Sequence, residues 1–214
     1  MKSKHLIKTV IPVILICSLA FCSVFSSFAA PEMSADCVSL YKNNIEVASF
    51  SDIDSAFAAI TDAVGEYVIL LKNTDAEYAL SCEKTPDAVS IVIRTEEQIA
   101  KTVNILSETF TVTSTLEFVN VNVQFKKMDI GASAIAFNRV SRAKGNELVG
   151  ESSSTVILNY STLNIASVDV GTVTSLGFSF SEGDFYADKV KGTVSFGVPL
   201  GTDKRYKVKI NSFG

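Results

Sequence analysis

The stretch Tyr67-Val68-Ile69-Leu70-Leu71 is a short run of β-branched and aliphatic residues, and five similar runs follow it along the chain. They cover residues 89–93, 110–114, 133–137, 155–158 and 176–180. The starts of the six runs are separated by 22, 21, 23, 22 and 21 residues. A nearly fixed spacing of this size indicates a β-solenoid, in which each turn of the chain stacks on the previous one. We therefore predict a mainly β fold of this kind, with a β-sandwich as the alternative.

Further strands are predicted between these runs, over residues 102–106 and 115–125. In the second stretch apolar and polar residues alternate, as they do on a strand with one buried face, apart from the adjacent pair Phe118-Val119. This break in the alternation indicates a bend or a bulge at which the strand changes face. A solenoid with a several-sided cross-section requires more than one strand in each repeat.

An amphipathic helix is predicted just before the first run, over residues 52–64. Its apolar residues recur at spacings of three and four, which places them on one face of a helix. They are Ile53, Ala56, Phe57, Ile60 and Val64. Ser51 is positioned to cap the helix, with Asp54 three residues later, and Gly65 follows the last turn. We interpret residues 46–66 as an N-terminal cap on the solenoid, preceded by a polar lead-in over residues 31–45.

Two strands are predicted in the C-terminal part, over residues 193–198 and 206–210. Tyr206, Val208 and Ile210 would face inward, while Lys207 and Lys209 would face water. We expect the two strands to form a β-hairpin that closes the end of the solenoid, because an exposed last turn favours aggregation. The solenoid turns are accordingly assigned to residues 67–184 and the C-terminal strands to residues 185–214.

The first thirty residues have the layout of a secretory signal peptide. Lys2, Lys4 and Lys8 precede an apolar run over residues 10–21, the small-residue stretch 26–30 follows, and none of the thirty is acidic. Cleavage after Ala29 would remove residues 1–29 and leave a single domain, 30–214, that is secreted or exposed at the cell surface. Two alternatives stay open, namely an uncleaved membrane anchor and a lipoprotein modified at Cys22.

The composition of residues 30–214 argues against several classes of function. Sixteen basic and 23 acidic residues give this part a net charge of −7, which disfavours binding to nucleic acid or to an anionic membrane surface. The only histidine of the chain, His5, lies in the predicted signal peptide. Ser-His and Cys-His catalysis and histidine-bearing zinc sites are therefore excluded from the mature domain. We predict no cofactor and no metal site.

Two cysteines, Cys37 and Cys82, remain after removal of the signal peptide. Two cysteines in an oxidising compartment favour one disulfide, which would tie the lead-in to the first solenoid turn. A bridge that closes a loop of 45 residues is expected to stabilise the fold by about 4 kcal/mol. The alternative is a pair of buried thiols.

Two segments carry a family resemblance, ASFSDIDSAFAAI at residues 48–60 and GEYVILL at residues 65–71. They resemble the entry segment of bacterial cell-surface proteins with right-handed parallel β-helices, the pectate-lyase-like architecture. In that group a short helix caps the first turn and leads straight into a strand. The stretch TSTLEFVNV at residues 113–121 also resembles a common turn of those helices. The resemblance covers residues 46–180 and implies a right-handed parallel β-helix at the cell surface, not an activity.

Three groups of polar residues are candidates for chemistry, and each is more simply explained as a loop or a turn. Asp129 precedes Arg139, Arg142 and Lys144, but no pair of aspartates lines up with them as in a calcium-dependent lyase. Residues 73–77 and 181–184 offer oxygen ligands for calcium without the spacing of an EF-hand. The pair Glu96-Glu97 supplies at most one of the two carboxylates that a glycosidase needs. No catalytic residue is assigned.

The leading hypothesis is therefore a secreted or surface-exposed, non-catalytic β-solenoid module. Its expected partners are a glycan or another protein of the cell envelope, with no role for nucleic acid and with membrane contact only through an uncleaved signal segment. The alternative is a carbohydrate-active enzyme, a lyase or hydrolase of acidic polysaccharide. Three or more charged residues that converge in one groove on the flank of the solenoid would favour this enzyme hypothesis.

Overall fold

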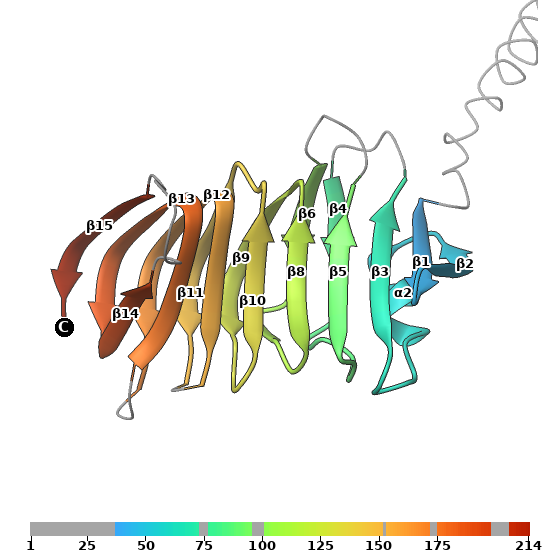
Figure 1. Ribbon diagram of the computed structural model, residues 1–214, viewed down its shortest axis with the longest axis horizontal. Coiled ribbons are helices and arrows are strands. Elements are labelled where there is room, and N and C mark those ends of the chain that lie inside the picture. The colour runs from blue at the N-terminus through green and yellow to red at the C-terminus, as the bar shows by residue number, and fades with distance from the viewer. Residues whose placement is uncertain (1–36, 73–76, 96–100, 152, 172–174, 198–205) are drawn as a thin grey trace, which may run out of the picture. The chain divides into compact units, whose positions relative to one another are not determined.

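The computed structural model of the protein describes residues 37–72, 77–95, 101–151, 153–171, 175–197 and 206–214. These residues form a β-solenoid of about six turns, in which strands far apart in the sequence lie side by side (Figure 1). The main prediction from the sequence, a mainly β solenoid, is therefore confirmed. The predicted signal peptide, residues 1–29, lies outside the described residues.

One row of parallel strands, which we call the first face, begins each turn of the solenoid. It consists of β3 (Glu66–Leu71), β5 (Ser90–Arg94), β8 (Thr115–Val119), β10 (Ala134–Asn138), the first parts of β12 (Thr155–Asp169) and β13 (Ser175–Lys191), and β14 (Thr193–Gly197). Each strand after β3 pairs in parallel with the strand one turn earlier in the chain, and β3 pairs antiparallel with β1 (Val38–Lys42). Five of the six apolar runs supply residues of the first face, and β8 and β14 complete it.

A second row of parallel strands, the second face, continues each turn after a corner. It consists of β4 (Glu77–Leu80), β6 (Lys101–Ile105), β9 (Val121–Asp129), β11 (Ala143–Val149), the later parts of β12 and β13, and β15 (Tyr206–Phe213). The short strand β7 (Thr109–Thr111) pairs with the last residues of β9. Several strands per turn, as the sequence predicts, produce this several-sided cross-section.

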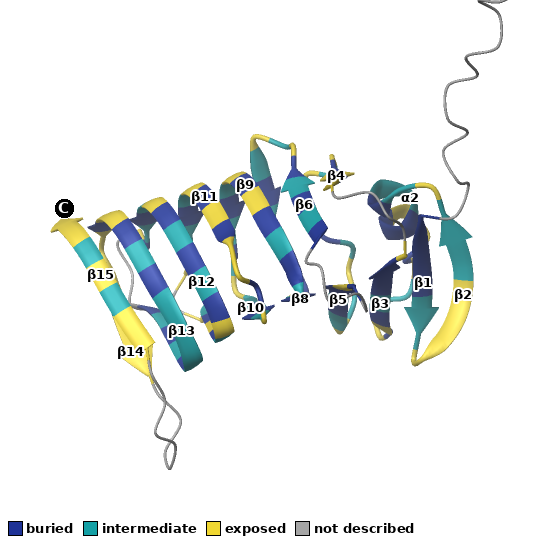
Figure 2. Cartoon of the chain, turned by 90° about the horizontal axis from the view of Figure 1, so that it is seen from above, coloured by how far each residue is buried: buried dark blue, intermediate teal, exposed yellow. Residues whose placement is uncertain are grey.

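Apolar side chains stack in rows through the interior, because alternate residues of each strand point inward. Buried and less buried residues alternate along β12 and β13 (Figure 2). One interior row contains Ile69, Ile93, Phe118, Phe137, Leu158 and Phe180, all with no exposed surface. The rings of Phe118 and Phe137 are stacked, with centroids 5.8 Å apart. Burial of each such side chain contributes about 1.5–3 kcal/mol to folding.

The turns differ in length more than the sequence pattern predicts. Partners on successive turns are 25 residues apart between Ser90 and Thr115 and only 18 apart between Phe178 and Phe196. One of the six runs was also placed wrongly, since Phe110 belongs to β7 and the first-face strand of that turn is β8. The reason is that both stretches are apolar, and only pairing with neighbouring turns decides which one lies on the first face.

The corners between the faces explain the predicted break at Phe118-Val119. The next residue, Asn120, has a φ of 56°, and Arg139 and Tyr160 adopt nearly the same value at the equivalent corners of the following turns. A second kind of corner repeats the pattern Asp-x-Gly. In it the amide N–H groups of Gly131 and Gly171 donate to the carboxylates of Asp129 and Asp169 at 3.0 and 2.9 Å, and both glycines have positive φ.

The hairpin of this fold lies at its N-terminal side and not at the C-terminal side. Strands β1 (Val38–Lys42) and β2 (Ile45–Phe50) are antiparallel, and the two residues between them, Asn43 and Asn44, both have positive φ. This is the geometry of a two-residue hairpin turn, for which asparagine is well suited. The lead-in, for which the sequence analysis predicted no strand, thus contains both β1 and the start of β2.

The predicted C-terminal hairpin is wrong, because β14 and β15 each pair in parallel with β13. The two strands form one further turn of the solenoid. Val194 pairs with Leu176, and Val208 pairs with Phe185, so the apolar residues of the last strands extend the interior rows. This packing against β13 is the physical reason for parallel pairing in place of a hairpin.

The predicted helix is shorter than its apolar pattern. Helix α2 (Ile53–Ala58) has Asp52 as its N-cap residue in place of Ser51, and the amide of Ser55 donates to the Asp52 carboxylate at 2.6 Å. Ile53, Ala56 and Phe57 are buried, and α2 contacts β1, β2 and β4. Val64, predicted to belong to the apolar face, is 79% exposed because the helix ends before it.

Candidate functional site

A row of outward-facing polar residues crosses four consecutive strands of the second face. Lys144 on β11 pairs with Asn164 on β12, which pairs with Tyr186 on β13, which in turn pairs with Lys209 on β15. They face outward because their neighbours along each strand, such as Leu163 and Phe185, face the interior. Strands lie about 4.8 Å apart, so the row extends over about 14 Å from Lys144 to Lys209.

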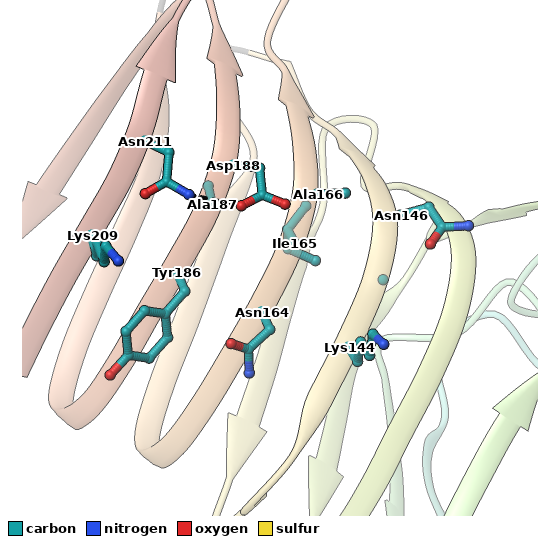
Figure 3. A pocket seen from close by; sticks show the side chains of 11 residues that line it. Lys144, Asn146, Asn164, Ile165, Ala166, Tyr186, Ala187, Asp188, Lys209 and Asn211 are labelled. Atoms are coloured by element: carbon teal, nitrogen blue, oxygen red, sulfur yellow. Dashed lines mark hydrogen bonds between the residues drawn. The ribbon is translucent and has the colours of Figure 1, made fainter.

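A second row runs beside the first, at the positions where the regular pairing between turns is interrupted. It contains Asn146, Ala166, Asp188 and Asn211. Ala166, the smallest of these side chains, lies between Asn146 and Asp188. The two rows, with Gly145, Ile165 and Ala187 between them, line a groove of about 280 Å³ (Figure 3).

The side chains around the groove are held by contacts within the second face. The hydroxyl of Tyr186 donates to the Asp184 carboxylate at 3.1 Å, and the amide of Asn211 donates to the Asp188 carboxylate at 2.8 Å. The ammonium group of Lys207 lies 5.4 Å from the centre of the Tyr186 ring, within the range of a cation–π contact. The aromatic ring and the two carboxylates are therefore positioned before any ligand arrives.

The groove offers several kinds of contact to a ligand. Asn146 and Asn164 present amides that both donate and accept hydrogen bonds, Lys144 and Lys209 present ammonium groups, and Asp188 presents a carboxylate. Tyr186 adds an aromatic surface with a polar tip. Shallow and partly polar, the groove suits an elongated hydroxylated ligand better than a compact apolar one.

The structure separates the residues of the proposed lyase-like group. Asp129 ends β9 and is engaged at the Asp-x-Gly corner, whereas Arg139 occupies a corner between the two faces. Lys144 lies exposed on β11 and Arg142 lies exposed just before that strand, and Lys144 alone of the four lines the groove. The group as predicted therefore does not form a site, but one of its members belongs to a different one.

The other candidate residues are distributed as follows. Residues 73–76 and the pair Glu96-Glu97 lie outside the described residues, while Glu77 on β4 accepts a hydrogen bond from Asn104 at 3.2 Å. Residues 181–184, interpreted as a turn, run through strand β13. Within the described part of the chain, no cluster of three or more histidine, cysteine or acidic residues is arranged to hold a metal ion.

The two cysteines are not joined in the structure. Among the described residues no disulfide links Cys37 to Cys82, so the predicted pairing is not seen in the structure and stays a prediction. Different elements hold them, since the carbonyl of Cys37 accepts from the amide of Lys72 at 2.9 Å, whereas the amide of Cys82 donates to Asp54 on α2 at 3.0 Å. Burial and the Asp54 carboxylate raise the pKa of the Cys82 thiol to about 12. The thiol therefore stays protonated at neutral pH and is a weak nucleophile.

Sequence reasoning missed most residues of the groove, namely Asn164, Tyr186, Asp188 and Lys209. A signal was nevertheless present, since Lys144, Asn164, Tyr186 and Lys209 follow one another at intervals close to the repeat length. It becomes visible only when the register of the second-face strands is known, because a polar residue on an exposed strand face is common in any β protein.

Comparisons with known proteins give no information on function. No protein-family model matches the chain, and no curated protein or solved structure is significantly similar to it. The helices in the described part of the chain include none that is long and apolar enough to span a bilayer. The functional argument therefore depends on the chemistry of the second face.

Proposed function

We propose that the chain is a secreted or surface-exposed, non-catalytic module that binds a glycan through the groove on the second face. The signal-like N-terminus and the resemblance of residues 46–180 to bacterial cell-surface proteins with pectate-lyase-like β-helices support the location. The row of Lys144, Asn164, Tyr186 and Lys209 is the observation that supports glycan binding. Binding of this kind would serve adhesion or attachment to the cell envelope.

The chemistry of the row matches that of a sugar. Sugar hydroxyls act as both donors and acceptors, and the amide of Asn164 offers both functions at one position. The face of a sugar ring carries C–H groups that pack on an aromatic ring, which Tyr186 supplies while its hydroxyl is held by Asp184. Since the row follows the solenoid axis, a linear oligosaccharide would contact several turns at once.

Glycan-array binding of the purified chain, followed by affinity measurements on the strongest ligand, tests this proposal. Replacement of Tyr186 by alanine should weaken binding about 10-fold through the loss of the stacking surface. Tyr160→Ala is the matched control, because Tyr160 is 57% exposed at a corner between the faces and does not line the groove. Equal affinities of the two variants, or no binding to any glycan, would contradict glycan binding in this groove.

One observation favours the enzyme alternative. Three charged residues, Lys144, Asp188 and Lys209, line the same groove, which is the convergence that the sequence analysis named as its criterion. A glycosidase needs two carboxylates on opposite sides of the bond, and Asp188 is the only acidic residue that lines the groove in the described chain. Incubation with each bound glycan, followed by assays for new reducing ends and for unsaturated products, separates the two hypotheses. Products that disappear in Asp188→Asn would establish an enzyme.

A further inference from the structure

Four exposed cationic side chains on the second face have no acidic partner within ion-pair distance among the described residues. They are Arg142, Lys144, Lys207 and Lys209. Three other lysines are ion-paired, Lys42 with Asp62, Lys72 with Glu46 and Lys191 with Asp169. In a chain of net charge −4, the second face therefore carries a local excess of positive charge that the protein itself does not neutralise.

Lys144 and Lys209 line the two ends of the groove, and Arg142 and Lys207 each lie two residues away from one of them in the sequence. Lys144 belongs to β11, which Arg142 immediately precedes, and Lys207 and Lys209 belong to β15. The strand pairs between them carry uncharged Asn164 and Tyr186 in the Lys144 row. With three strand spacings between them, the two cationic ends are about 14 Å apart. The carboxylates of Asp188, which lines the groove, and of Asp184, the strand partner of Lys207, lie between the ends and would repel an anionic group bound at the centre.

The geometry points to a linear saccharide that carries carboxylate or sulfate groups, bound along the solenoid axis with its anionic groups at the two ends of the groove. This inference rests on the proposed glycan-binding function and adds the charge of the ligand. Ammonium groups bind oxyanions as point charges, and the guanidinium of Arg142 forms paired hydrogen bonds with either oxyanion. Neutral sugar between the anionic groups would contact Asn164 and Tyr186.

Three polymers with one backbone test the charge of the ligand, namely dextran, carboxymethyl dextran and dextran sulfate. Binding of the full chain to each immobilised polymer is measured at low and at physiological ionic strength. We expect the charged polymers to bind more tightly than dextran, and their binding to weaken with salt because exposed charge pairs are screened. The ratio of the affinities for carboxymethyl dextran and dextran sulfate shows whether the groove prefers a carboxylate or a sulfate ligand.

The double variant Lys144→Gln/Lys209→Gln should bind the charged polymers roughly 5- to 10-fold more weakly, as expected for two exposed charge pairs. Its control is Lys42→Gln/Lys72→Gln, which removes the same charge at the N-terminal side and should change binding less than about 2-fold if the contact is local. Circular dichroism melts verify that both variants are folded. Equal losses in the two variants would show a general charge effect and overturn the inference.

Two other outcomes also overturn the inference of an anionic ligand, and they distinguish its failure from a failure of the proposed glycan binding. If the charged polymers bind no more tightly than dextran, or if none of the three binds, the ligand is not recognised by its charge. Tyr186→Ala then decides the broader question on the strongest ligand from the glycan array. A loss of affinity in Tyr186→Ala without any effect of Lys144→Gln/Lys209→Gln would preserve glycan binding and reject an anionic ligand.

Discussion

Residues 37–65 and residues 115–190 are held together by different kinds of contact. The first region uses an antiparallel hairpin and a short capped helix, neither of which recurs elsewhere in the described fold, together with ion pairs such as Lys42 with Asp62. The second region repeats the same solution in every turn, with parallel strands outside and rows of apolar side chains inside. The contrast teaches that the repeated region is stabilised by packing that recurs in each turn, while the N-terminal region is stabilised by elements that occur once in the described fold.

The largest effect is expected in the repeated region, for Phe137→Ala. Phe137 is fully buried between Phe118 and Leu158, and removal of a buried phenylalanine side chain costs about 3–5 kcal/mol. Because total stability is typically about 5–15 kcal/mol, the midpoint of denaturant unfolding should fall strongly. Ala136→Ser on the outer side of the same strand is the control and should have little effect. If Phe137→Ala shifts the unfolding midpoint only slightly, the turns are not stabilised by their interior rows.

A somewhat smaller loss is expected for Phe57→Ala in the N-terminal region. Phe57 is 3% exposed on α2, and we predict that the helix acts as a cap on the first turn. Its removal should cost about 3 kcal/mol, at the lower end of the usual range because the helix lies at one side of the stack. Melting temperatures and size-exclusion profiles check this, with Ala58→Ser on the exposed side as the control. If Phe57→Ala and Ala58→Ser lower the melting temperature by the same small amount, and neither forms a new oligomer, a capping role is contradicted.

The loss of the helix N-cap in Asp52→Ala should cost about 1 kcal/mol at neutral pH. The amide hydrogen bond from Ser55 lowers the pKa of Asp52 below its ordinary value of 3.8. A lowered pKa in the folded state stabilises the fold above the unfolded value and loses this effect as the pH falls through the folded value. The difference in unfolding free energy between wild type and variant should therefore shrink below about pH 4. A constant difference from neutral to acid pH would exclude an ionised cap.

The smallest structural effect, but a clear chemical one, is expected at Cys82. Because the thiol pKa is raised to about 12, alkylation with iodoacetamide at mildly alkaline pH should be far slower in the folded protein than after unfolding. Asp54→Asn keeps an oxygen acceptor for the amides of Ser81 and Cys82 but removes the negative charge, so alkylation should accelerate. Mass spectrometry without reductant gives the rates. If Cys82 is not alkylated even after unfolding, and reacts only once a reductant is added, the disulfide predicted from the sequence is supported instead.

The interior of the solenoid could be predicted from sequence because its signal is local. Alternation such as that of residues 115–125 marks one strand and its corner, and the broken step at Phe118-Val119 corresponds to the corner at Asn120. The exact turn length could not be predicted, since Phe110 and Leu116 are equally suitable for an apolar run. Only pairing between turns places Leu116 on the first face.

The groove could not be predicted because its residues become neighbours only through register. Lys144 and Lys209 are separated by three turns, and their relation depends on three successive strand pairings in the second face. The turn Lys42-Asn43-Asn44-Ile45 was a readable hairpin signal that the sequence analysis did not use. The C-terminal strands were wrongly predicted to form a hairpin. Apolar and polar residues alternate along β15 in the same way whether its partner strand is antiparallel or parallel.

The unequal steps between turns, from 18 to 25 residues, have a consequence for how the protein tolerates change. Each turn gains its stability from the turn before and the turn after it, so the fold behaves as a one-dimensional array of coupled units. An insertion at a corner lengthens one loop at a small entropic cost and leaves the neighbouring interfaces intact. A deletion within a strand instead inverts the side chains that follow it, since adjacent residues point to opposite sides. Length variation among relatives should therefore concentrate at the corners, where it alters the outer surface without disturbing the interior.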